Sequence, residues 1–103
     1  MIDLSGKAIL VTGSTRGIGN KIGATLVEHG AVVGYHGRDR DQVESICNHM
    51  PGSIPLAADL NTPEQAAHLL KTFVEQAGKI DGLVNNAGSG RAVAFRGLTL
   101  EDW

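Results

Sequence analysis

The chain has 103 residues, enough for one folded domain, of which 42% are hydrophobic and 19% are charged. This balance is ordinary for a globular protein and excludes a chain that is disordered throughout. The net charge is −2 with both signs scattered, which argues against nucleic acid as a partner. The apolar runs are short and no charged-then-apolar leader opens the chain, so we expect a cytoplasmic protein without membrane contact.

Cysteine and histidine usage predicts no metal site. Cys47 is the single cysteine, which excludes an internal disulfide, and the four histidines follow no metal-ligand spacing. Cys47 falls on the apolar stripe of an expected helix. We therefore expect it in the core rather than as a reactive thiol.

A glycine-rich turn follows the first predicted strand, residues 7–11. Its glycines are Gly13, Gly17 and Gly19, and the apolar residues Ile18, Ile22 and Leu26 then recur every four positions, as in a helix. Without a Cβ, these glycines permit a sharp turn, close approach of a ligand and close helix packing. The unpaired N–H groups at the helix start then favour a phosphate. A plain turn is the alternative, and the absence of a following lysine disfavours an NTPase.

Strands and helices alternate along the rest of the chain. Further strands are predicted at residues 31–35, 53–58 and 80–84. One intervening helix carries Val43, Ile46, Cys47 and Met50 on a single face. The next begins with a Thr62-Pro63-x-Gln65 capping box and ends at Gly78.

Four strands alternating with three helices predict an α/β fold with a doubly wound parallel sheet, the Rossmann fold. Ligands of such sheets bind beyond the carboxyl ends of the strands. Polar or glycine residues stand at each predicted strand end, and we expect them to converge along one edge of the sheet. They are Thr12-Gly13, His36-Gly37-Arg38, Asp59 and Asn85-Asn86.

Three motifs in this order carry a family resemblance: Thr-Gly-x-x-x-Gly-Ile-Gly at residues 12–19, Asp59-Leu60, and Asn-Asn-Ala-Gly at residues 85–88. With them the whole chain resembles the short-chain dehydrogenase/reductase family, nearest to the 3-oxoacyl-(acyl carrier protein) reductase-like members. The resemblance implies a nicotinamide dinucleotide whose pyrophosphate lies in the glycine turn, whose adenine amino group binds Asp59, and whose riboses lie along residues 85–88. The implied cofactor-binding residues are Thr12, Gly13, Ser14, Thr15, Arg16, Gly17, Ile18, Gly19, Gly37, Arg38, Asp59, Leu60, Asn85, Asn86, Ala87 and Gly88. A helix-flanking acid at Asp59 and a plain turn at Asn85-Asn86 are the alternatives.

The choice between NADP and NAD depends on charge at the end of the second strand. An acid there would bind a ribose 2′-OH, whereas a cation would bind a 2′-phosphate. The chain has Gly37-Arg38 at this position, and Arg16 in the glycine turn is a second guanidinium. The sequence therefore favours NADP, while the nearby Asp39 and Asp41 keep NAD open and Arg38 has the alternative of an ordinary solvated side chain.

The resemblance also implies a Tyr-x-x-x-Lys pair with a serine and an asparagine, none of which can be placed. Tyr35 is the only tyrosine, it lies in a predicted strand, and Asp39 stands four residues on. No catalytic residue is therefore predicted. We expect residues 1–103 to be a single NAD(P)-binding domain, the N-terminal half of a longer reductase that ends before the catalytic segment.

Two functions follow from this interpretation. In the first, the chain derives from an NADP(H)-dependent oxidoreductase that acts on a small-molecule carbonyl or secondary alcohol, a 3-oxoacyl thioester being one candidate, and is inactive alone. In the second, it is a non-catalytic dinucleotide-binding or scaffolding module. We also expect self-association, because the fourth strand would form an exposed sheet edge.

Overall fold

The structure is a computed structural model that describes residues 2–86. Its strands and helices, in chain order, are β1 (Ala8–Val11), α1 (Gly17–Glu28), β2 (Val32–Gly37), α2 (Arg40–Cys47), β3 (Ser53–Ala57), α3 (Pro63–Ala77) and β4 (Gly82–Val84). All strands run parallel in one sheet of order β3-β2-β1-β4. The predicted alternation and the Rossmann-like α/β fold are therefore confirmed.

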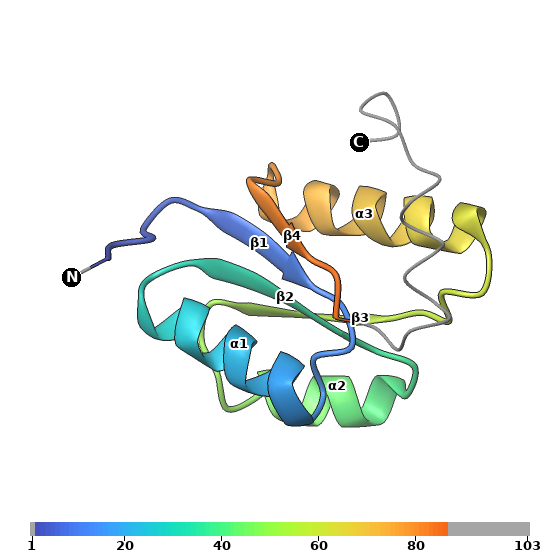
Figure 1. Cartoon of the computed structure of the whole chain (residues 1–103), viewed down its shortest axis with the longest axis horizontal. Coiled ribbons are helices and arrows are strands. Elements are labelled where there is room, and N and C mark those ends of the chain that lie inside the picture. Colours follow the sequence, from blue (N-terminus) through green and yellow to red (C-terminus); the bar gives the residue numbers. More distant parts are fainter. Residues whose placement is uncertain (1, 87–103) are drawn as a thin grey trace.

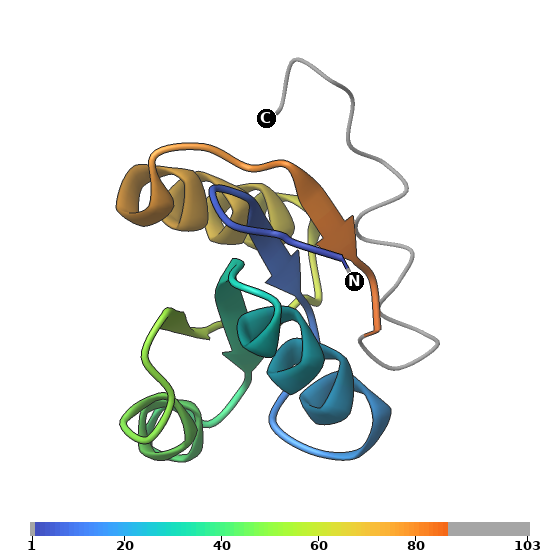
Figure 2. The same cartoon turned by 90° about the vertical axis from the view of Figure 1, so that its left-hand side faces the viewer.

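The sheet separates two layers of helices. Helices α1 and α2 cover one face, and α3 covers the other (Figures 1 and 2). Each face has its own apolar core, because strands buried on both sides place alternate side chains into opposite layers. The core under α3 includes Leu10, Leu56 and Phe73, and the core under α1 and α2 includes Val11, Val33, Tyr35 and Val43.

Two close approaches bring the helices onto the sheet. A Cβ at Gly34 would lie 2.7 Å from the Phe73 ring, and one at Gly23 would lie 2.6 Å from the Tyr35 ring. Tyr35 is fully buried, and its hydroxyl donates a hydrogen bond to Met50 Sδ at 3.1 Å. The glycines thus make room for the largest side chain in each core.

The ends of α2 and α3 are closed by the chain's own side chains. Asp39 accepts hydrogen bonds from the N–H groups of Asp41 and Gln42 at the start of α2. Thr62 accepts one from Gln65 N–H at the start of α3, as predicted, and Gly78 ends α3 in the left-handed region at φ +89°. The Gln65 side chain departs from the predicted box, because its Oε1 accepts from Asn61 N–H (3.3 Å) rather than from Thr62.

Strand boundaries differ most from the prediction at the end of β2 and the start of β4. Strand β2 continues to Gly37, because His36 and Gly37 pair with Leu56 and Ala57 of β3. Strand β4 starts only at Gly82, because the Asp81 carboxylate, and not a strand carbonyl, accepts the Ala8 N–H at 2.8 Å.

Within residues 2–86, no helix has the length and apolar character needed to cross a membrane.

Candidate nucleotide site

Polar contacts join the carboxyl ends of β1 and β4. Thr12 Oγ1 accepts a hydrogen bond from Asn86 N–H at 2.9 Å, and Asn86 Nδ2 donates to the Gly13 carbonyl at 3.2 Å. Thr12 is fully buried, so its hydroxyl holds the strand ends together. This fixes the position of the turn that leaves β1.

The turn after β1 has a backbone that suits glycine. Gly13 has φ +62° and Gly17 φ +63°, both in the region that side chains disfavour. Gly19 is required for a different reason, since a Cβ there would lie 2.3 Å from the Gly13 carbonyl oxygen and 2.4 Å from Asn86 Nδ2. All three predicted glycines therefore shape the path from β1 into α1.

The start of α1 differs from the starts of the other two helices. Its N-cap residue, Arg16, makes no side-chain capping hydrogen bond, and the first turn holds no acidic residue. The first N–H groups of a helix have no partner within the helix, and they attract an anion. Ile18 beside them is 74% exposed, so this end of α1 is open to a ligand. The arrangement fits a phosphate group of a bound nucleotide.

His36 joins the glycine turn to the ends of β2 and β3. Its Nδ1 accepts the Gly13 N–H at 2.9 Å, and its Nε2 lies 2.9 Å from the Ala58 carbonyl oxygen. Ser14 adds further contacts, because its N–H donates to the His36 carbonyl and its hydroxyl accepts the His36 N–H at 2.7 Å. The predicted convergence of the strand ends is therefore confirmed from β3 across to β4.

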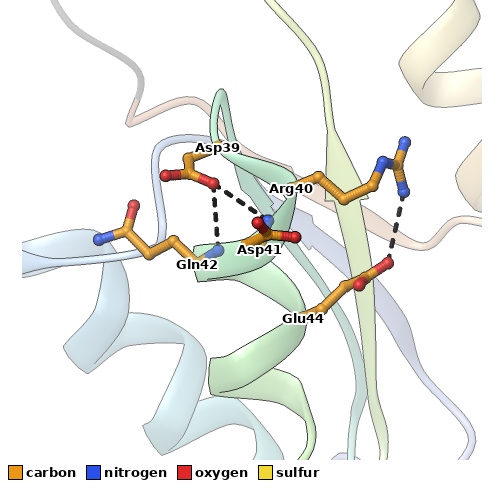
Figure 3. A network of polar contacts seen from close by, with 5 residues as sticks. All are labelled: Asp39, Arg40, Asp41, Gln42 and Glu44. Atoms are coloured by element: carbon orange, nitrogen blue, oxygen red, sulfur yellow. Dashed lines mark hydrogen bonds and ion pairs between the residues drawn. The ribbon is translucent and has the colours of Figure 1, made fainter.

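Two arginines lie at the surface of this edge. Arg16 and Arg38 are both exposed, and the ion pairs within residues 2–86, Arg40–Glu44 and Lys79–Asp81, use neither. Figure 3 shows that Asp39 Oδ1 is occupied by the main chain of α2, at 3.0 Å from Asp41 N and 3.3 Å from Gln42 N. Position 37 carries no acid, and a Cβ there would lie 2.5 Å from Thr15 Cγ2.

The Asp59-Leu60 pair after β3 divides between the site edge and the core. Leu60 is 1% exposed and packs in the core under α3, so its side chain faces away from the sheet edge. Asp59 is half-buried, and its Oδ2 accepts a hydrogen bond from Asn61 Nδ2 at 2.9 Å. The Asp59 carboxylate is thereby held at the strand end.

The structure brings most of the predicted residues to this edge. Thr12, Ser14 and Leu60 are buried, whereas Arg16, Gly17, Ile18 and Arg38 are exposed. The predicted Ala87 and Gly88 lie outside the described residues. His36 was predicted at this edge, as part of His36-Gly37-Arg38 at a strand end, but not as a cofactor-binding residue.

The remaining candidates for chemistry lie away from this edge. Within residues 2–86, no three His, Cys, Asp or Glu side chains are placed to hold a metal ion. Cys47 packs against the core under α1 and α2, as predicted, and burial raises the pKa of its thiol. Burial likewise raises the pKa of Tyr35, which keeps its phenol protonated.

Comparison with known proteins relates the chain to short-chain dehydrogenases. The family model described as short chain dehydrogenase matches residues 7–103. The uncharacterised oxidoreductase YvrD of Bacillus subtilis is 34% identical over 99% of this chain and 40% of its own length. The 3-oxoacyl-(acyl carrier protein) reductase FabG of Vibrio cholerae is 33% identical over 99% of this chain and 42% of its own length. The chain thus spans about two fifths of the relatives it matches.

Solved structures agree with the sequence relatives. A putative short-chain alcohol dehydrogenase from Sinorhizobium meliloti superposes with a TM-score of 0.78 at 37% identity, covering 84% of this chain and 36% of that protein. A hydroxysteroid dehydrogenase from Escherichia coli also gives a TM-score of 0.78, at 28% identity, over 85% of this chain and 39% of that protein. With its glycine turn, its parallel sheet and a match over residues 7–103, the chain belongs to the short-chain dehydrogenase family, a family of oxidoreductases.

Proposed function

We propose that this chain binds a nicotinamide dinucleotide, with its pyrophosphate at the start of α1 and its adenosine along the ends of β2 and β3. The observation that carries the proposal is the uncapped start of α1, when α2 and α3 are both capped by their own side chains. An unsatisfied helix start costs stability unless another group supplies an acceptor. A diphosphate is an acceptor of the required charge.

We further propose that NADP is the preferred dinucleotide. Arg38 follows β2 directly, it is exposed, and it makes no ion pair within residues 2–86. Asp39 was one reason to retain NAD as an alternative on sequence grounds. One of its carboxylate oxygens accepts hydrogen bonds from the N–H groups at the start of α2. A guanidinium offers paired donors to a 2′-phosphate, and Arg16 supplies a second one in the glycine turn.

Within the whole protein, the proposed activity is hydride transfer between the dinucleotide and a carbonyl or secondary alcohol. A 3-oxoacyl thioester is the candidate substrate, in line with the similarity to 3-oxoacyl-(acyl carrier protein) reductase FabG. The dinucleotide supplies or accepts the hydride, while the residues described here bind and orient it.

A second function, dinucleotide binding without turnover, is favoured by the position of Tyr35. Hydride transfer to a carbonyl needs a group that protonates the new alkoxide. Tyr35 is the only tyrosine of the 103 residues, and it is fully buried with its hydroxyl on Met50 Sδ. We therefore propose that the 103-residue chain alone binds the dinucleotide but does not reduce an acetoacetyl thioester.

Calorimetric titration of the chain with NADP⁺ and with NAD⁺ tests the binding proposal. We expect tighter binding of NADP⁺, and Arg38→Asp reverses that preference because a carboxylate repels the 2′-phosphate. Arg40→Asp is the matched control, since it makes the same charge change two residues on, at a side chain paired with Glu44. Absence of binding at about millimolar dinucleotide, an affinity of only about 4 kcal/mol, would refute the function.

A further inference from the structure

We propose that His36 is a positioning residue for the dinucleotide: its neutral imidazole holds the Gly13 turn in the conformation that directs the start of α1 toward the pyrophosphate. This inference rests on the proposed function for its ligand. The contact it assigns is present in the protein alone, so that contact can be measured separately.

The hydrogen bonds of His36 assign its tautomer. The Gly13 N–H points at Nδ1 from 2.9 Å, so Nδ1 carries no proton. The proton is then on Nε2, which donates to the Ala58 carbonyl oxygen at 2.9 Å. A doubly protonated ring would set its own Nδ1–H against the Gly13 N–H. Only the neutral ring satisfies both partners.

The surroundings of the ring favour that neutral form. His36 is 3% exposed, and burial lowers the pKa of the imidazole below its ordinary 6.5. The ring faces main-chain groups of Gly13 on the turn side. On the β3 side, the Ala58 carbonyl and the Asp59 carboxylate act in the opposite direction on the pKa without reversing the shift.

The hydrogen bond between Gly13 and His36 matters because the Gly13 turn supports the start of α1. Gly13 contributes its N–H to His36 and its carbonyl oxygen to Asn86 Nδ2, and that same carbonyl is the group against which Gly19 packs. A change in the Gly13 peptide therefore moves the surface on which α1 starts. Acid would release this contact and weaken dinucleotide binding through the turn.

Two substitutions distinguish the roles of the two ring nitrogen atoms of His36. In His36→Asn, the amide oxygen takes the place of Nδ1 and can accept the Gly13 N–H. In His36→Gln, the amide nitrogen takes the place of Nε2 and can donate to Ala58, but no acceptor remains for Gly13. Neither side chain titrates, so both variants remove the proposed acid response.

Binding of NAD⁺ between about pH 8 and pH 5 is the first measurement, chosen because NADP⁺ carries a 2′-phosphate that itself titrates near pH 6. The wild-type chain should lose affinity as the pH falls through the pKa of the buried ring, which lies below the ordinary 6.5. His36→Asn should bind NAD⁺ at every pH as tightly as the wild-type chain does at about pH 8. His36→Gln should bind about tenfold more weakly over the whole pH range, as expected for the loss of one hydrogen bond. Wild-type affinity and pH dependence in both variants would overturn the proposal.

Nitrogen-15 NMR of the wild-type chain without ligand is the second measurement, and it does not depend on either variant folding. The ring nitrogens should report the Nε2–H tautomer, and the Gly13 amide should exchange slowly above pH 6.5 and rapidly once the ring is protonated. An Nδ1–H tautomer or an unprotected Gly13 amide would overturn the contact. The expected NMR signals without any dinucleotide binding would instead refute the proposed function and leave the His36 contact standing.

Discussion

Replacement of Gly19 by alanine tests the link between the glycine turn and the nucleotide site. The new Cβ would lie 2.3 Å from the Gly13 carbonyl oxygen, whereas ordinary contact begins at 3.4 Å, so α1 has to move by about 1 Å at its first turn. The obstacle is main chain, which no change of rotamer can move aside. We therefore expect Gly19→Ala to displace the N–H groups that face the pyrophosphate.

The expected change in the stability of Gly19→Ala follows from two opposing effects. Overpacking costs about 1–3 kcal/mol, while alanine in place of glycine in a helix returns up to about 1 kcal/mol. A net loss of about 1 kcal/mol lowers the melting temperature of a domain of this size by about 4–8 °C. Loss of one hydrogen bond to a charged phosphate makes dinucleotide binding less favourable by about 1.5–3 kcal/mol, a decrease in affinity of about 10- to 100-fold. This loss affects binding and not the stability of the free chain.

Gly23→Ala is the matched control within the same helix. Gly23 is also buried, and a Cβ there would lie 2.6 Å from the Tyr35 ring, in the core rather than at the turn. Thermal unfolding by circular dichroism should show a loss of stability in both variants. Calorimetry with NADP⁺ below both melting temperatures should show weakened binding only in Gly19→Ala. Equal affinities of the two variants would refute the placement of the pyrophosphate beside Gly19.

Three further predictions concern stability. Thr62→Ala should lower the free energy of unfolding by about 1 kcal/mol in urea titrations, because it removes the acceptor for Gln65 N–H at the start of α3. Phe73→Ala should cost about 3–5 kcal/mol, since this fully buried ring fills the core under α3, and an unchanged midpoint in urea would contradict that packing. For His36 the folded-state pKa lies below the unfolded value of 6.5, so the unfolded chain binds more protons; stability should be constant above that pH and fall as pH drops toward the folded pKa, and His36→Asn should remove this fall.

Local signals in the sequence predicted the fold because they agree with one another. Alternating apolar runs and helical stripes give the order of elements, and Thr62, Pro63 and Gly78 fix the ends of α3 almost to the residue. Boundaries were predicted less well where a side chain replaces a main-chain partner. The start of β4 is the example, since Asp81 takes the Ala8 N–H that a longer strand would have used.

The site was predicted in outline, but its internal contacts were not. Glycine spacing and strand ends indicate where a nucleotide would lie, since both are properties of neighbouring residues. The His36 contact joins residues 23 positions apart, and no local pattern distinguishes it from an ordinary histidine. Ile18 continues the spacing of Ile22 and Leu26, which pack against the core, but it is exposed at the open helix start, where the resemblance implies a cofactor-binding residue.

The hydrogen bonds of the turn also restrict which donors a diphosphate can use. The Gly13 N–H is taken by the His36 ring and the Ser14 N–H by the His36 carbonyl, so neither remains for a ligand. Asn20 N–H already bonds to the Arg16 carbonyl within α1. The first N–H groups of α1, beginning at Gly17, have no acceptor within the helix and can serve an anion. His36 thus occupies two donors of the turn, Gly13 N–H and Ser14 N–H, and an anion can bind at the start of α1, where the helix dipole adds to the attraction.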